Sequence, residues 1–224
     1  MPVEEARHMK TKAIIFDLDG TLIDSLKDIA LHMNDALKEF NLPTHELSVY
    51  NTLLGDGALY LAQQAVPKNS SKELIEGVLL KYQELYAKEI YSFTKPYEGI
   101  YDLLEALENQ DLQLGILSNK PHFFTLKYAQ MFFGQFNFSQ IHGQKSDVPK
   151  KPHPQGALTI ATSFNLDPQE IFYVGDTPTD IKTAQNANMQ SIGVLWGFRT
   201  KEDLQEARAQ HLAQHPLDIL DIIN

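Results

Sequence analysis

Four short polar segments of the sequence contain residue types that suit phosphoryl transfer. Asp17 and Asp19 are separated by one residue, and Ser118, Lys151 and Asp176 stand in the three later segments. Carboxylate oxygens are the ligands that Mg²⁺ prefers, and a bound metal ion lets an anionic carboxylate approach a phosphate. Lysine and backbone N–H groups can bind the remaining phosphoryl oxygens. A pair of aspartates can also divide the work of nucleophile and proton carrier.

The apolar runs of the sequence predict the strands and helices that position these segments. Strands are expected near residues 12–17, 112–118, 140–142, 171–175 and 190–195, and helices near 100–109, 122–133, 153–164 and 178–187. This alternation predicts right-handed crossovers and an α/β fold, a doubly wound and mostly parallel sheet with a Rossmann-like core. Because ligands of open parallel sheets lie beyond the carboxyl ends of the strands, the polar segments are expected to converge there.

A helical block interrupts this alternation directly after the first strand. Residues 24–94 show apolar residues at helical spacing and no strand pattern, with Asp24-Ser25 as the expected N-cap of the first helix and a long helix over 72–90. We therefore expect an all-helical cap domain inserted into the core. The predicted division is a catalytic core of residues 10–23 and 95–224, a cap of residues 24–94, and a flexible tail of residues 1–9.

Composition argues against several classes of protein. The 224 residues include 19 Lys and Arg against 29 Asp and Glu, and the resulting net charge of -10 repels the phosphate backbone of nucleic acids. The absence of cysteine rules out thiolate nucleophiles, thiolate zinc sites and iron–sulfur clusters. No run approaches the ~20 apolar residues of a membrane helix. We therefore expect a soluble, cytoplasmic protein with neither nucleic acid nor membrane as a partner.

Taken in order, the four polar segments resemble the motifs of the haloacid dehalogenase superfamily. They read Asp17-Leu-Asp-Gly-Thr-Leu-Ile-Asp24-Ser25, Leu117-Ser-Asn-Lys120, Lys151-Pro-His-Pro154 and Val174-Gly-Asp-Thr-Pro-Thr-Asp180. Their order and spacing match over residues 12–200. The helical insertion, the Asn-Lys-Pro sequence of residues 119–121 and the run from Gly193 to Arg199 make the chain most similar to the phosphoglycolate phosphatase-like branch.

This resemblance implies a role for each matched residue. Asp17 would be the nucleophile that forms an aspartyl-phosphate, and Asp19 would protonate the leaving group and then activate water. Asp17 and Asp176 would be side-chain ligands of Mg²⁺, helped by the backbone carbonyl of Asp19 and by Asp180. Lys151 would lie between the nucleophile and the charge of the phosphate. The expected phosphate- and substrate-binding residues are Gly20, Thr21, Gly55, Gly57, Ser118, Asn119 and Lys151.

The residue type at position 19 separates the chemistries of this superfamily. Dehalogenases resemble this chain but carry an aromatic residue there, and phosphonatases carry a small one, whereas Asp19 supplies a proton carrier. We therefore predict a Mg²⁺-dependent phosphatase for a small phosphorylated metabolite, with phosphoglycolate as the first candidate. A pyrophosphatase, a nucleotidase, a sugar-phosphate mutase or a non-catalytic phosphate-binding protein are the alternatives. The chain is expected to act as a monomer or homodimer.

A few residues have a structural interpretation beside the functional one. Gly55-Asp-Gly57 reads either as a helix C-cap with its turn or as the part of the cap that meets the substrate. Asp180 reads either as a support of the metal site or as part of an N-cap of the following helix. We expect His122 and Arg199 to lie on the surface.

Overall fold

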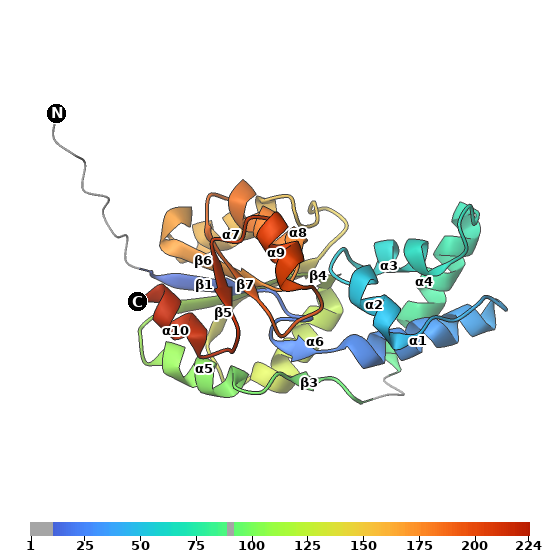
Figure 1. Ribbon diagram of the computed structural model, residues 1–224, viewed down its shortest axis with the longest axis horizontal. Helices are drawn as coiled ribbons and strands as arrows, with labels where there is room; N and C mark the ends of the chain where they lie inside the picture. Colours follow the sequence, from blue (N-terminus) through green and yellow to red (C-terminus); the bar gives the residue numbers. More distant parts are fainter. Residues whose placement is uncertain (1–10, 89–91) are drawn as a thin grey trace.

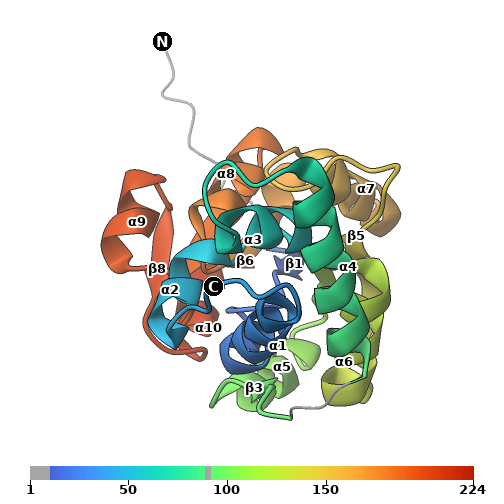
Figure 2. The same cartoon turned by 90° about the vertical axis from the view of Figure 1, so that its right-hand side faces the viewer.

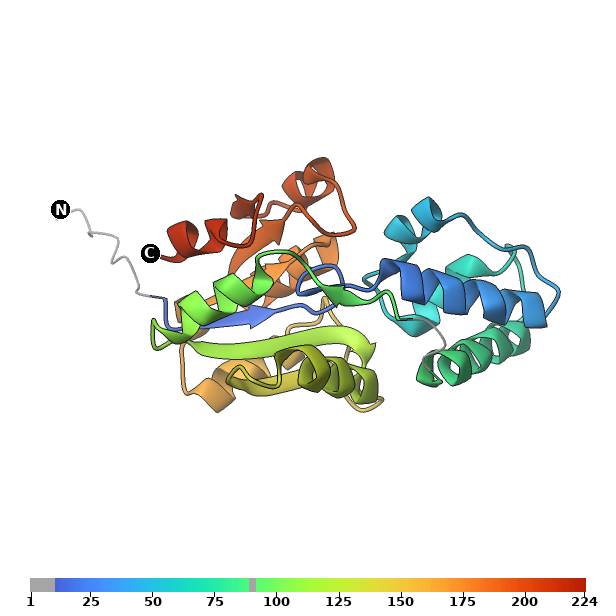
Figure 3. The same cartoon turned by 90° about the horizontal axis from the view of Figure 1, so that it is seen from below.

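The computed structural model describes residues 11–88 and 92–224, and it consists of a layered α/β core with a helical bundle beyond one end (Figure 1). The tail expected over residues 1–9 and the end expected at residue 90 for the last cap helix lie outside the described residues. The bundle faces the carboxyl ends of the core strands (Figure 3). The functional segments of the core are therefore covered by the bundle.

Within the described residues, the core sheet contains six strands, and every neighbouring pair is parallel. Its order is β5-β4-β1-β6-β7-β8. The bounds are Ala13–Phe16 for β1, Gln113–Pro121 for β4, Phe138–Gln144 for β5, Ile171–Gly175 for β6, Gln190–Val194 for β7 and His211–Ala213 for β8. The predicted doubly wound parallel sheet is confirmed, and the last strand is an addition that the apolar runs did not predict.

Helices cover both faces of this sheet. Along β1, Ile14 and Phe16 point to one face and Ala13 and Ile15 to the other, as the two-residue period of a strand requires. The helices on the first face are α5 (Ile100–Glu108), α6 (His122–Phe133) and α10 (Asp218–Ile223). Those on the second face are α7 (Gln155–Phe164) and α8 (Pro178–Asn186), with α9 (Lys201–Glu206) against α8 and a 3-10 turn at Pro168–Glu170.

The bundle is formed by the helices that follow the first strand. These are α1 (Leu26–Glu39), α2 (Leu47–Leu53), α3 (Ala58–Ala65) and α4 (Lys72–Ala87). They stand in front of the sheet when the molecule is seen from the end that carries the bundle (Figure 2). Met33, Tyr50, Val78 and Tyr82 are buried between them. The predicted helical insertion is thus present, and its buried apolar residues are continuous with those on the first face of the core sheet.

Two short strands connect this bundle to the core. β2 (Ile23–Asp24) and β3 (Lys95–Pro96) pair antiparallel, so the chain enters and leaves the bundle side by side. The carboxylate of Asp28 in α1 joins the two connections, because it accepts hydrogen bonds from the backbone N–H groups of Phe93 and Thr94. The hydroxyl of Thr94 donates to it as well. We call β2, β3 and this contact the tether.

Candidate active site

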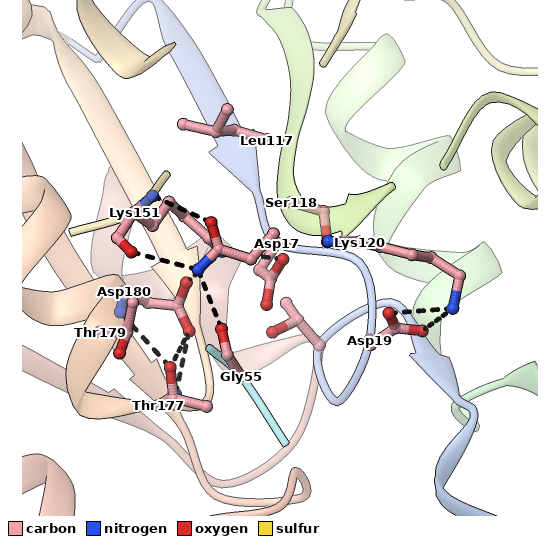
Figure 4. A network of polar contacts seen from close by, with 12 residues as sticks. Asp17, Asp19, Gly55, Leu117, Ser118, Lys120, Lys151, Thr177, Thr179 and Asp180 are labelled. Carbon is pink, nitrogen blue, oxygen red and sulfur yellow. Dashed lines mark hydrogen bonds and ion pairs between the residues drawn. The ribbon is translucent and has the colours of Figure 1, made fainter. Parts of the chain in front are cut away.

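The parallel sheet brings the polar segments of the sequence to one edge. Asp17 follows β1, and Asp176 follows the neighbouring β6. Ser118 and Asn119 belong to the end of β4, the other neighbour of β1. Figure 4 shows Asp17 between Lys151 and Asp180 on one side and the end of β4 on the other. The residues expected at the site therefore lie together, beneath the helical bundle.

Three buried carboxylates form the centre of this site. Oxygens of Asp17, Asp176 and Asp180 all lie within 4.8 Å of one another, and the three residues are only 4%, 0% and 0% exposed. Burial raises the pKa of Asp17 from 3.8 to about 7; Lys151 opposes this rise and Asp180 adds to it. Burial, with the charges of Asp180 and Asp17, also raises the pKa of Asp176 well above its usual range. The cluster therefore favours a bound cation.

The ammonium of Lys151 is the cation that this cluster already contains. Its Nζ lies 2.9 Å from Oδ1 of Asp17 and 2.6 Å from Oδ1 of Asp180. Burial acts to lower the pKa of Lys151, but the two carboxylates raise it well above its ordinary value. The backbone N–H of Lys151 donates to the side chain of Asn119 at 2.9 Å. Lys151 is thus held charged and fixed beside the predicted nucleophile.

Asp176 is positioned by contacts with two other segments. Its Oδ1 accepts a hydrogen bond from the Thr21 hydroxyl at 3.1 Å, and its Oδ2 accepts one from the backbone N–H of Phe198 at 2.8 Å. Gly20 and Gly197 pack so closely that a Cβ on them would lie 2.3 Å and 2.2 Å from Asp176 atoms. We expected Gly20 and Thr21 to contact phosphate. In the structure the Thr21 hydroxyl donates to Asp176, and Gly20, which has no side chain, lets the Asp176 carboxylate approach the backbone.

Asp180 has both of its oxygens engaged. Oδ1 accepts from Lys151, and Oδ2 accepts from the backbone N–H and the hydroxyl of Thr177 at 3.0 Å and 2.7 Å. The contacts with Thr177 form a capping box at the start of α8. Asp180 therefore takes part in the N-cap of α8 and also belongs to the acidic cluster. Its contacts suit holding Lys151 better than binding a metal ion directly.

Asp19 points away from Asp17 and toward Lys120, a residue outside the predicted site (Figure 4). Its Oδ1 accepts from the Ser25 hydroxyl at 2.6 Å, so this hydroxyl does not cap α1 as expected. The Nζ of Lys120 lies 3.0 Å and 3.1 Å from the two Asp19 oxygens and 2.9 Å from the hydroxyl of Tyr86 in α4. The feature of the sequence that could have indicated this contact is a lysine directly after Asn119, at the end of a buried strand.

The glycine-bearing loop between α2 and α3 lies against the core. Asn119 donates from its side chain to the backbone carbonyl of Gly55 at 3.0 Å, and Lys150 donates to that of Asp56 at 2.8 Å. Gly55 and Gly57 have φ values of +110° and +86°, a region that favours glycine. A Cβ on Gly57 would lie 3.1 Å from the carbonyl oxygen of Asn119. The loop therefore contacts core residues of the site, in line with the interpretation of Gly55-Asp-Gly57 as the part of the cap that faces the substrate.

Arg199 of the core binds the end of α2, directly before this loop. Its guanidinium donates to the backbone carbonyls of Asn51, Thr52 and Leu54 at the end of α2. The expectation that Arg199 is a surface residue was wrong, since the side chain is half-buried in this contact. His122 is also half-buried, and its Nδ1 accepts a backbone N–H of β5 at 3.1 Å. Neither role has a local sequence pattern, because both partners are distant in the chain.

A cavity of about 50 Å³ lies between the bundle and the core. Its core side consists of Asp17, Asp19, Ser118, Asn119, Lys120 and Pro121, and its bundle side of Ile29, Leu54, Gly55, Gly57, Ala58, Leu61 and Tyr82. One water molecule needs about 10–15 Å³ by this kind of measure. The cavity therefore suits a ligand of few atoms.

The chain is similar to known proteins over nearly its whole length. Residues 14–194 match the family described as haloacid dehalogenase-like hydrolase. The chain is 31% identical to the phosphoglycolate phosphatase of Mannheimia succiniciproducens, over 95% of this chain and 98% of that protein. The structure of a predicted phosphoglycolate phosphatase from Haemophilus somnus matches with a TM-score of 0.88 and 30% identity, over 96% of this chain and 98% of that one. A predicted phosphatase from Clostridium acetobutylicum matches with a TM-score of 0.85 and 26% identity, over 96% and 98%.

This chain belongs to the haloacid dehalogenase-like hydrolase family, as the sequence motifs indicated. It is an enzyme of the hydrolase class, and the similar proteins above are named as phosphatases or predicted phosphatases. Between residues 11 and 88 and from 92 onward, no helix has the length and apolar character that crossing a membrane requires.

Proposed function

We propose that this chain is a Mg²⁺-dependent phosphatase that hydrolyses phosphoglycolate through an aspartyl-phosphate intermediate. The observation that carries the proposal is the buried cluster of Asp17, Asp176 and Asp180 with Lys151, placed under a docked cap. Near-full-length similarity to a phosphoglycolate phosphatase supports the choice of substrate. We place the enzyme in the cytoplasm as a monomer or homodimer, with residues 24–94 acting as the cap.

The residues present fit a magnesium ion. Oδ1 of Asp17 is buried and accepts no hydrogen bond within the described part of the chain, although the Lys151 ammonium is 2.9 Å away. One ammonium cannot balance three clustered carboxylates, and oxygen donors suit Mg²⁺. Asp17 and Asp176 would hold the ion together with the backbone carbonyl of Asp19, while Asp180 holds Lys151. A bound Mg²⁺ would neutralise charge on the phosphoryl group.

The side chains of the site can carry both halves of the reaction. Asp17 attacks phosphorus, forming its bond to the phosphoryl group as the bond to the leaving oxygen breaks, and Asp19 gives that oxygen a proton. Asp19 then takes a proton from the water that attacks the aspartyl-phosphate, which releases phosphate and restores Asp17. Ser118, the backbone N–H of Asn119 and Lys151 bind the phosphoryl oxygens.

The geometry of Asp19 adds a conformational step to this sequence. Its carboxylate is held by Ser25 and Lys120 and is turned away from Asp17. The Asp19 side chain therefore rotates toward Asp17 when a substrate is bound. The docked cap keeps bulk water out of the site during this rotation. The aspartyl-phosphate is therefore protected until Asp19 activates the attacking water molecule.

Phosphate release from a panel of esters tests the proposal. The panel contains 2-phosphoglycolate, pyrophosphate, nucleoside monophosphates and glucose 1-phosphate, each with Mg²⁺ and with EDTA, ranked by kcat/KM. We expect 2-phosphoglycolate to rank first, EDTA to stop turnover, and Asp17→Asn to be inactive while the exposed Asp147→Asn stays active. A higher kcat/KM for pyrophosphate or a nucleotide, or conversion of glucose 1-phosphate without phosphate release, would contradict it.

A further inference from the structure

Lys120 is a buried cation that the hydrolytic steps above do not use. Only 7% of the residue is exposed, and it lines the cavity between the cap and the core. Its Nζ lies 4.7 Å and 4.9 Å from the ring centroids of Tyr86 and Tyr128. Among the described residues that line this cavity, Lys120 is the one with a positive charge.

The anionic partner of Lys120 is the residue that has to move during the reaction. Asp19 cannot approach the leaving oxygen and also keep its 3.0 Å and 3.1 Å contacts with the ammonium. A buried ammonium without an anion is costly, and the hydroxyl and rings of the tyrosines replace only part of the lost interaction. When Asp19 turns toward the leaving group, Lys120 therefore needs another anion beside it.

The position of Lys120 also limits where that anion can be. The leaving oxygen of the substrate has to lie within reach of the rotated Asp19 carboxylate, and the position beside Nζ that this carboxylate vacates is one side-chain rotation away. A negative group one carbon away from the leaving oxygen would thus reach the ammonium. A cavity of about 50 Å³ has room for such a short group and little more.

The cap offers no competing charge for this group. Its side of the cavity contains Ile29, Leu54, Ala58 and Leu61, with Tyr82 as the one polar side chain there among the described residues. Apolar walls exclude bulky and strongly hydrated leaving groups but cannot recognise an anion. Recognition of a second negative charge on the substrate therefore falls to the core, at Lys120.

We propose that Lys120 is the residue that selects substrates by binding a carboxylate on the leaving group, which favours phosphate esters of short 2-hydroxy acids. The inference rests on the proposed phosphatase function and deepens it, because it assigns the part of the site that distinguishes such an ester from a neutral one. The hydroxyl of Tyr86, 2.9 Å from Nζ, orients the ammonium.

The test compares two esters of equal carbon number on the full-length enzyme with Mg²⁺. 2-Phosphoglycolate carries the carboxylate, and ethyl phosphate has a methyl group in its place. We expect Lys120→Met to lower kcat/KM for 2-phosphoglycolate at least about tenfold more than for ethyl phosphate, chiefly through KM. Tyr86→Phe should give a smaller loss of the same kind. Lys182→Met, which removes an exposed lysine from α8, should change neither ester.

Several results would overturn the inference. Equal losses on both esters in Lys120→Met, carried by kcat, would mean that the lysine only positions Asp19. Equal kcat/KM values of the wild-type enzyme for the two esters would remove the carboxylate site while leaving the phosphatase intact, and this comparison requires no variant to fold. Absence of phosphate release from either ester by the wild type would instead overturn the proposed function, and the carboxylate site with it.

Discussion

Replacing Asp17 with Asn should abolish turnover and yet stabilise the metal-free protein at neutral pH. Asparagine has nearly the shape of a protonated aspartic acid and cannot ionise. The carboxylate of Asp17 is buried, and this burial raises its pKa from 3.8 to about 7 despite the nearby Lys151. The native fold therefore disfavours the charged form of Asp17, which the variant no longer has.

The pKa gives the sign and the size of this effect. Because the folded protein binds the Asp17 proton more tightly than the unfolded chain does, the free energy of unfolding falls as pH rises from 3.8 through about 7. Each pKa unit is worth about 1.4 kcal/mol, so the whole rise corresponds to about 4 kcal/mol. With about 2–4 °C per kcal/mol for a chain of this size, Asp17→Asn should raise Tm by about 8–16 °C above pH 7.

Thermal unfolding in EDTA, between about pH 5 and about pH 8.5, measures this difference. We expect the Tm of the wild type to fall relative to that of Asp17→Asn as pH rises, while the exposed Asp147→Asn follows the wild type. Adding Mg²⁺ should raise the Tm of the wild type far more than that of Asp17→Asn. Parallel Tm curves for wild type and Asp17→Asn would refute the reasoning, since the charge of Asp17 would then cost nothing in the fold.

Three further substitutions test other parts of the site. Asp19→Asn should lower kcat by about 10²–10⁴, and with para-nitrophenyl phosphate it should give a burst of nitrophenol, since an activated leaving group needs no acid but the water still needs a base. Gly20→Ala should weaken Mg²⁺ binding in a metal titration, because its Cβ would lie 2.3 Å from an Asp176 oxygen and its φ is +86°. Arg199→Ala should cost about 2 kcal/mol, a Tm decrease of about 4–8 °C, and raise KM, because the end of α2 loses the bonds that this guanidinium donates from the core. An unchanged Tm and KM would show that the cap docks without them.

The core was predictable because its strands are short apolar runs that end in polar segments. β1, β4 and β6 have this pattern, and parallel topology then requires their carboxyl ends to meet. β8 has only three residues at the sheet edge, two of them half-buried, and therefore shows no apolar run. The strands of the tether have two residues each, which is too short for any periodic signal.

The contacts of the site were less predictable than its location. The hydroxyls of Thr21 and Ser25 are engaged by Asp176 and Asp19, through bonds that depend on how the loop after β1 folds. Tyr86, which contacts Lys120, and the partners of Arg199 come from the cap, which only the docked structure brings near these core residues. Local patterns show residue type and element, whereas docking between two units is a long-range property.

The tether described above also bears on how such an enzyme changes over evolutionary time. The chain leaves and re-enters the core through the paired strands Ile23–Asp24 and Lys95–Pro96. The two ends of the insertion are therefore held side by side, whatever sequence lies between them. Lengthening an insertion whose ends are already held together adds little entropic cost to folding. A different insertion can therefore replace the cap, and with it the walls of the cavity, while the carboxylates at the strand ends stay in place. The size and polarity of the cavity walls can in this way change with the cap, while the bond chemistry and the charge selection by Lys120 are inherited with the core.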